Sequence, residues 1–218
     1  MNIAKYIDHT LLKADAVDSE FNQLCEEALE YEFMSVCVNS SRVAYVSKKL
    51  RDSVVKVCAV VGFPLGQTDS QVKAFEARRC IEEGAHELDM VINIGFLKSG
   101  KLREFEEDIR AVKRTCSKNT ILKVIIETSL LTDEEKVIAC EISKKVKVDF
   151  VKTSTGFSGA GAVSEDIALM RRIVGPDMGV KASGGIRDYA TAMEMIKSGA
   201  NRIGAGAGVA IVTGQKGQ

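Results

Sequence analysis

The chain is organised around VDFVKTSTGF, residues 148–157. This stretch starts as a short apolar run that carries one lysine, Lys152, and it passes directly into the polar segment Thr-Ser-Thr-Gly. A lysine inside an apolar strand is costly unless its amine is paired or neutral. The stretch therefore predicts a buried strand with an unusual amine near its end.

Four other stretches have the same form, an apolar run with a polar residue or a glycine-rich segment towards its end. They are ELDMVIN (87–93), ILKVIIET (121–128), GVKASGG (179–185) and RIGAGAG (202–208). If all five are parallel strands of one sheet, their functional ends meet at one edge. Asp89, Lys123, Lys152 and Lys181 would then share a site.

Strand-like and helix-like segments alternate along the chain. Such alternation indicates parallel strands joined by right-handed crossovers. Eight repeats of the unit predict a single (β/α)8 TIM barrel, with an open doubly wound sheet as the alternative. We expect one domain over residues 1–212 and a mobile C-terminal tail over 213–218, TGQKGQ.

Helix signals lie between the strand-like runs. Apolar residues over 19–31 follow a helical period, and Asp18 or Ser19 is a candidate cap. Thr132 and Glu135 have the spacing of a capping box. We expect the segment NIGFLKSG (93–100) to be a loop.

The composition excludes several classes of partner. The chain has 30 basic and 30 acidic residues, which argues against nucleic acid or an anionic membrane as a partner. The N-terminal segment lacks the apolar core of a signal peptide, and no apolar run is long enough to span a bilayer. Six cysteines without a zinc spacing and two histidines predict reduced thiols, no metal site and a cytoplasmic location.

Lys152 is a candidate nucleophile. A neutral amine attacks a carbonyl to form a Schiff base, and a nearby cation such as Lys181 would lower the pKa of that amine. Chemistry alone does not choose between Lys152 and Lys181. The alternative is that both are strand-end lysines whose amines extend to water.

Asp89, Lys123 and Asp8 are the other charged candidates. Asp89 lies in mid-strand, where it could transfer protons or form a structural ion pair inside the barrel. Lys123 lies deeper, so we expect it to pair with Asp89 rather than to attack a substrate. Asp8 could orient polar groups or cap the following turn.

Glycine-rich segments follow the last two strand-like runs. Exposed N–H groups at helix N-termini attract anions, and the loops after strands 7 and 8 of a barrel are a recurrent phosphate site. Gly184 and Gly185 lie in the first segment and Gly204–Gly208 form the second. They predict a phosphate site, unless these glycines serve tight turns alone.

The motifs taken together resemble the deoxyribose-phosphate aldolase family over nearly the whole chain. They are IDHTLLK, SVCVNS, VVGFPLG, ELDMVINIG, LKVIIET, DFVKTSTGF, VKASGGIR and GANRIGAG, in this order. The resemblance implies a cofactor-free class I aldolase on a (β/α)8 barrel. Such an enzyme interconverts 2-deoxyribose 5-phosphate with glyceraldehyde 3-phosphate and acetaldehyde in deoxyribose phosphate catabolism, commonly as a homodimer.

The resemblance also implies roles for particular residues. Lys152 would form the Schiff base, Lys181 would lower its pKa, and Asp89 would transfer protons with an ordered water. Lys123 and Asp8 would complete the polar network. The residues implied around the phosphate are Gly156, Gly184, Gly185, Arg187, Gly204, Gly206 and Ala207.

The chain departs from the family at two places. Many members have serine where this chain has Gly206 and Ala207, so hydroxyl donors to the phosphate are lost there. Some members use a C-terminal tyrosine to transfer protons, whereas the last tyrosine here is Tyr189. The alternatives to the aldolase are a non-covalent sugar-phosphate isomerase or epimerase on the same barrel and a non-catalytic phosphosugar-binding protein.

Overall fold

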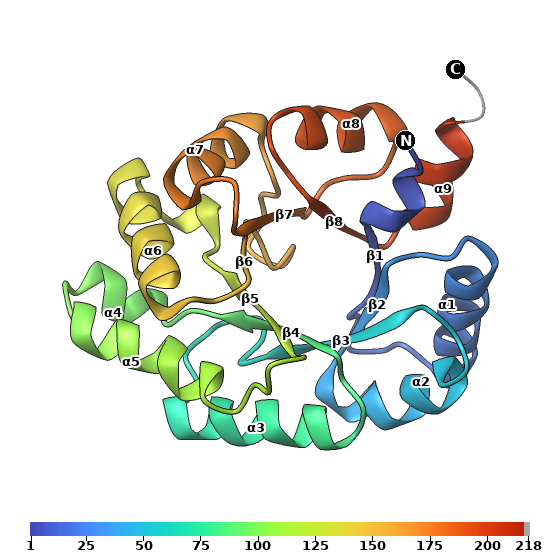
Figure 1. Cartoon of the computed structure of the whole chain (residues 1–218), viewed down its shortest axis with the longest axis horizontal. Helices are drawn as coiled ribbons and strands as arrows, with labels where there is room; N and C mark the ends of the chain where they lie inside the picture. Colours follow the sequence, from blue (N-terminus) through green and yellow to red (C-terminus); the bar gives the residue numbers. More distant parts are fainter. Residues whose placement is uncertain (216–218) are drawn as a thin grey trace.

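Eight short apolar runs form parallel strands that close into a barrel, as shown by a computed structural model that describes residues 1–215 (Figure 1). The strands are β1 (Ile7–Leu11), β2 (Ser35–Val38), β3 (Lys56–Val61), β4 (Glu87–Val91), β5 (Ile121–Ile125), β6 (Phe150–Lys152), β7 (Gly179–Ser183) and β8 (Arg202–Ala205). Each strand pairs with the next, and β8 pairs with β1. The predicted (β/α)8 barrel is confirmed, because an open sheet would leave β1 and β8 unpaired.

Helices surround the barrel as an outer ring (Figure 1). They are α1 (Asp18–Glu30), α2 (Val43–Leu50), α3 (Ser70–Glu82), α4 (Ile94–Lys98), α5 (Leu102–Lys113), α6 (Asp133–Val146), α7 (Ser164–Val174), α8 (Tyr189–Lys197) and α9 (Gly208–Gly214). The described residues also form three 3-10 helices: η1 (Ile3–Tyr6) precedes β1, η2 (Ser40–Arg42) connects β2 to α2, and η3 (Thr128–Leu130) connects β5 to α6. Within residues 1–215, no helix combines the length and apolarity needed to cross a membrane.

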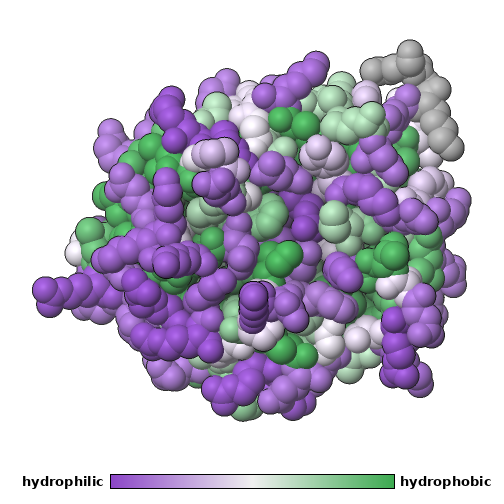
Figure 2. All heavy atoms as spheres, in the orientation of Figure 1, coloured by the Kyte–Doolittle hydropathy of each residue, from purple (hydrophilic) through white to green (hydrophobic). Residues whose placement is uncertain are grey.

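The main apolar core lies between the barrel and the helices. Helix α1 shows how the sequence forms it, because Phe21, Leu24, Cys25 and Ala28 recur at helical spacing and are all buried. Burying one such large side chain stabilises the fold by about 1.5–3 kcal/mol. Leu29 follows the same helical period but is 42% exposed. In the view down the barrel, hydrophilic side chains predominate on the surface (Figure 2).

The inner face of the barrel carries charged residues together with a small apolar cluster of Cys37, Cys58 and Val60. Residues in register on parallel strands face the same side of the sheet. Asp89 is in register with Lys123, and Lys152 is in register with Lys181. The register therefore places these four side chains inside the barrel.

Two local predictions were wrong and one is confirmed. Helix α4 occupies most of the segment expected to be a loop, because the Asn93 side chain accepts a hydrogen bond from the Phe96 N–H at 3.1 Å and caps it. Helix α1 begins at Asp18 with Val17 as its N-cap, so neither Asp18 nor Ser19 is the cap. The capping box of Thr132 and Glu135 is present, with reciprocal hydrogen bonds of 3.3 and 2.9 Å.

The C-terminal segment packs beside the N-terminal one. Helix α9 lies next to η1 (Figure 1) and ends at Gly214, two residues beyond the expected domain boundary. The Thr213 hydroxyl donates a hydrogen bond to the Val209 carbonyl oxygen at 2.9 Å, within this helix. Residues 216–218 of the expected tail lie outside the described residues.

Candidate active site

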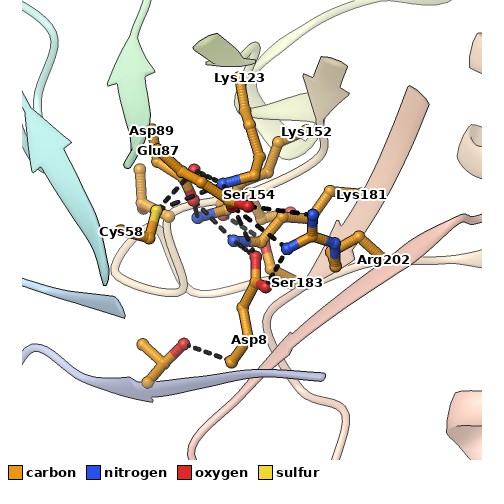
Figure 3. Close-up of polar contacts among 12 residues, drawn as sticks. Asp8, Cys58, Glu87, Asp89, Lys123, Lys152, Ser154, Lys181, Ser183 and Arg202 are labelled. Atoms are coloured by element: carbon orange, nitrogen blue, oxygen red, sulfur yellow. Dashed lines mark hydrogen bonds and ion pairs between the residues drawn. The ribbon is translucent and has the colours of Figure 1, made fainter. Parts of the chain in front are cut away.

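Asp89 on β4 is the centre of a buried ion network inside the barrel (Figure 3). Its Oδ1 atom accepts hydrogen bonds from Lys123 Nζ at 2.8 Å and from Cys58 Sγ at 3.1 Å. Its Oδ2 atom accepts from Lys152 Nζ at 2.8 Å and from Lys181 Nζ at 2.7 Å. One carboxylate therefore contacts three lysines from three successive strands.

Asp8 on β1 is the second carboxylate of the network. It lies 2.5 Å from Lys181 Nζ and 2.5 Å from an Arg202 nitrogen, and it accepts a hydrogen bond from the Ser35 hydroxyl at 2.7 Å. Lys123 Nζ is 3.8 Å away. The five charged residues predicted from the sequence are thus neighbours, while their roles stay predictions.

Sequence reasoning missed two members of the network, Glu87 and Arg202. Glu87 lies 2.6 Å from Lys123 Nζ and 3.1 Å from Arg202, and the Arg202 guanidinium lies 5.5 Å from the Phe150 ring centroid. Both are the first residues of their strands. A signal was present, because Glu87 and Asp89 alternate along one strand and must face the same side.

The network fixes the charge of its members. Burial alone would raise the pKa of Asp89, but Lys123, Lys152 and Lys181 outweigh it and hold that pKa well below its usual range. In the same way burial opposes charge on Asp8, whose pKa is lowered by Lys181, Arg202 and Lys123. Burial alone would lower the pKa of Lys181, but Asp8 and Asp89 raise it. At neutral pH the two aspartates are therefore anions and Lys181 is a cation.

Lys152 differs from the other cations because it lines a cavity. Its strand β6 ends at this residue, where the Ile126 N–H donates to the Lys152 carbonyl oxygen at 3.0 Å. The cavity measures about 340 Å³ at the C-terminal ends of the strands, where barrel enzymes hold their substrates. Lys123, Lys181 and Arg202 are not among its lining residues.

The same cavity brings together all the residues predicted to surround a phosphate. The cavity is lined by Gly156, Gly184, Gly185, Arg187, Gly204, Gly206 and Ala207, with Ala205 of the predicted Gly204–Gly208 segment and with Ser183 and Ile186, which flank the predicted glycine pair. Thr10, Leu12 and Thr155 also line it and were not predicted. Thr10 and Leu12 are neither glycines nor charged residues, so the patterns that predicted the other lining residues did not select them. The cavity thus joins the Lys152 amine to the glycine-rich segments.

The backbone of the cavity wall is suited to an anion. Gly184 and Gly185 both have positive φ, 86° and 78°, a conformation that lets successive N–H groups point towards one ligand. Within residues 1–215, the N–H groups of Gly156, Gly184 and Gly185 donate no hydrogen bond to the protein. Arg187 adds a positive side chain to the same wall.

A glycine also makes room for the lysine pair. A Cβ atom at Gly204 would lie 3.0 Å from Cε of Lys181, which is tighter than an ordinary van der Waals contact. Gly204 therefore allows the Lys181 stem to pass β8 and reach both aspartates.

Three potential metal-ligating groups lie close together in the described part of the chain. The sulfurs of Cys37 and Cys58 and a carboxylate oxygen of Asp89 are within 4.8 Å of one another. A hydrogen bond with Cys58 lowers the pKa of Cys37, but burial raises the pKa of Cys58 well above its usual value and keeps that thiol protonated. A metal needs deprotonated thiols, and the lysines around Asp89 oppose a further cation, so this group does not fit a metal.

Lys152 thus lines a barrel cavity together with Arg187 and the glycine-rich segments, and its amine donates to the buried Asp89 carboxylate. Residues 2–214 match the family described as DeoC/LacD family aldolase, and the chain belongs to this family.

Several similar proteins agree with this assignment. A curated deoxyribose-phosphate aldolase from Clostridium tetani is 58% identical over 216 residues, which is 99% of this chain and 100% of that protein. A solved structure of a putative deoxyribose-phosphate aldolase from Coccidioides immitis is 42% identical with a TM-score of 0.96, and it covers 99% of this chain and 86% of that chain. The deoxyribose phosphate aldolase of Aeropyrum pernix, described as tetrameric, is 32% identical with a TM-score of 0.89 over 98% of this chain and 91% of its own.

Proposed function

We propose that the chain is a class I aldolase that reversibly cleaves 2-deoxy-D-ribose 5-phosphate to D-glyceraldehyde 3-phosphate and acetaldehyde. The observation that carries the proposal is the position of Lys152, whose amine contacts Asp89 and also lines the cavity with the glycine-rich wall. The name of the Clostridium tetani relative supports the choice of substrate. No observation favours the isomerase, epimerase or binding-protein alternatives.

The charge balance of the network supports Lys152 as the nucleophile. Four cationic side chains, Lys123, Lys152, Lys181 and Arg202, surround three carboxylates, Asp8, Glu87 and Asp89. The network thus holds one more cationic side chain than carboxylates. Lys152 is the one of these four that lines the cavity, whereas Lys123 and Lys181 are fully buried.

The residues can carry out each step of the reaction. Neutral Lys152 adds to the carbonyl of acetaldehyde, and loss of water gives an iminium ion. A water held on Asp89 removes a methyl proton to give an enamine, which attacks the aldehyde carbon of glyceraldehyde 3-phosphate. Hydrolysis then frees the product and restores Lys152. Asp89 Oδ2 contacts both Lys152 and Lys181, so protons can move between the two lysines through this carboxylate.

The glycine-rich wall has a separate task. The phosphate lies away from the reacting carbons, so its contacts with the N–H groups of Gly156, Gly184 and Gly185 orient the substrate rather than break bonds. Arg187 contributes charge to the same contact.

Borohydride trapping tests the proposal. The protein is incubated with acetaldehyde and reduced, and the adduct is located by intact mass and peptide mapping. We expect one reduced ethyl group on Lys152, which should be absent in Lys152→Met and retained in the surface control Lys147→Met. An adduct on Lys181 would reverse the two lysine roles, and a folded protein without any adduct would overturn the aldolase mechanism.

We also infer a homodimeric assembly and a cytoplasmic location. Oligomerisation of a relative supports the first, since the Aeropyrum pernix aldolase is described as tetrameric. Six free cysteines support the second, because free thiols persist in reducing compartments. Sedimentation analysis of the purified chain tests the assembly, and a monomer at micromolar concentration would contradict it.

A further inference from the structure

Glu127, two residues after β5, is a buried carboxylate that the proposed reaction does not use. Its side chain belongs to a residue only 1% exposed, and no lysine, arginine or histidine of residues 1–215 lies within ion-pair distance of it. Its backbone is left-handed, with φ of 56°, which is unfavourable for a residue with a side chain. A buried carboxyl group without an ion-pair partner and a strained backbone are both costly, and such features gather at functional sites.

Every hydrogen bond to the Glu127 carboxylate in the described chain comes from the loop that follows β6. We call residues 153–158, TSTGFS, the TSTGFS loop. The Thr155 N–H donates to both Glu127 oxygens at 3.2 and 3.3 Å, and the hydroxyls of Thr155 and Ser158 donate to Oε2, the latter at 3.0 Å. The Thr155 oxygen in turn accepts from the Phe157 N–H at 3.0 Å. Glu127 thus holds both ends of the turn that contains Gly156.

The TSTGFS loop supplies one wall of the cavity. Thr155 and Gly156 line it, and Gly156 lies opposite Gly184, since a Cβ atom at Gly156 would lie 4.0 Å from the Gly184 Cα atom. Lys152 is held separately, by backbone hydrogen bonds of the barrel. The Ile126 N–H donates to the Lys152 carbonyl oxygen at 3.0 Å, and the next residue, Thr153, donates its N–H to the Lys181 carbonyl oxygen at 3.1 Å. Glu127 therefore acts on the wall that faces the phosphate rather than on the amine.

We propose that Glu127 is a positioning residue that fixes Gly156 against Gly184 and so makes the site prefer a phosphorylated sugar. The proposal rests on the proposed function. A carboxylate is needed because it only accepts hydrogen bonds and here receives them from three groups of one loop. A glutamine at this position would turn an NH2 group towards at least one of these donors.

The test compares two substrates that differ only in the phosphate. We would measure kcat/KM for 2-deoxyribose 5-phosphate and for 2-deoxyribose with the wild type, Glu127→Gln and the exposed control Glu134→Gln. Displacement of a binding group lowers rates steeply, so Glu127→Gln should lose about 10- to 100-fold with the phosphorylated substrate. Its activity on 2-deoxyribose, and both activities of the control, should stay close to wild type.

Equal losses on both substrates, or no loss on either, would overturn the proposal. Ser158→Ala removes one donor to Glu127 without touching the cavity lining, so it should give a smaller loss of the same selectivity and serves if Glu127→Gln does not fold.

Calorimetric titration with inorganic phosphate separates this inference from the proposed function. Weaker phosphate binding by Glu127→Gln than by Glu134→Gln is expected whether or not the wild type cleaves the sugar, and equal binding would contradict the positioning role. A wild type that binds phosphate but cleaves neither sugar would count against the proposed function alone.

Discussion

Lys152 and Lys181 donate hydrogen bonds to the same oxygen atom, Oδ2 of Asp89, at 2.8 and 2.7 Å. The two lysines are in register on β6 and β7, so their stems run side by side into the barrel. Lys181 is fully buried and its pKa is raised by Asp8 and Asp89 against the effect of burial, whereas Lys152 reaches the cavity. One oxygen thus links a cation that keeps its proton to an amine that can meet a substrate.

Replacement of Lys181 separates the two lysine roles. In Lys181→Met the neighbour of Lys152 loses its charge and its proton, so we expect kcat to fall by about 10²- to 10⁴-fold, the usual contribution of a proton-transfer group. The acetaldehyde adduct should still form on Lys152, only more slowly. Steady-state kinetics and trapping measure the two effects, with the exposed Lys197→Met as control. Unchanged kcat in a folded Lys181→Met protein would remove Lys181 from the mechanism.

Asp8 should matter for stability as well as activity. Asp8→Asn keeps the shape of the side chain but leaves the buried cations Lys181 and Arg202 without one of their carboxylates. Breaking a buried ion pair in this way destabilises a protein by about 3–5 kcal/mol. Urea unfolding would measure the loss, and the exposed Asp177→Asn should change little. A loss similar to that of the control would mean that the network contributes little to folding.

Asp8 and Asp89 determine how the free energy of unfolding falls at acid pH. Their folded-state pKa values are lowered by the surrounding lysines and Arg202, which outweigh burial, whereas an unfolded aspartate titrates near pH 4. Their contribution is therefore complete above about pH 4 and is lost as pH falls towards the lower folded-state pKa, because protons bind the unfolded chain first. Each should weaken stability by about 1.4 kcal/mol per pH unit within that range.

Urea midpoints measured between about pH 5 and pH 3 test this slope. The wild type and Asp177→Asn should lose stability equally as pH falls, and Asp8→Asn should show a shallower dependence by the share of one carboxylate. Parallel curves for all three proteins would show that Asp8 is not held in its charged form by the fold.

The cavity wall predicts that Ala207→Ser binds the phosphorylated substrate more tightly. This residue lines the cavity, so Ala207→Ser adds a hydroxyl donor near the expected phosphate. One neutral hydrogen bond contributes about 0.5–1.5 kcal/mol, so KM for the phosphorylated substrate should fall by about 2- to 10-fold. Ala210→Ser, on the exposed side of α9, is the control. An unchanged KM would place the phosphate away from Ala207.

The sequence predicted the barrel and the main charged residues for a physical reason. Parallel strands bring their C-terminal ends to one edge, so in-strand charges such as Asp89 and Lys181 had to meet. Glu87 and Arg202 were not predicted as members of the network, because a charged residue at the start of a strand is usually exposed. Here both lie inside the closed barrel. Helix α4 was not predicted, because its five residues are too few to show a helical period.

Glu127 shows a different limit of sequence reasoning. It directly follows the apolar run of β5, where a polar residue is expected at a barrel rim. Its importance comes from a left-handed backbone and from donors about thirty positions away, in residues 155–158. Neither feature follows from local composition, so the contacts of Glu127 with residues 155–158, unlike its place at the barrel rim, could be recognised only in the folded chain.

The contact between Asp8 and Arg202 joins residues 194 positions apart, on the first and the last strand of the barrel. Contacts so distant along the chain form only after a loss of chain entropy, so we expect β1 and β8 to pair late in folding. Lys181 depends on Asp8 from the far side of this strand pair. The reactive centre is therefore complete only when β1 and β8 have paired and the barrel is closed. Enzymatic turnover would consequently measure the fraction of molecules in which the barrel has closed.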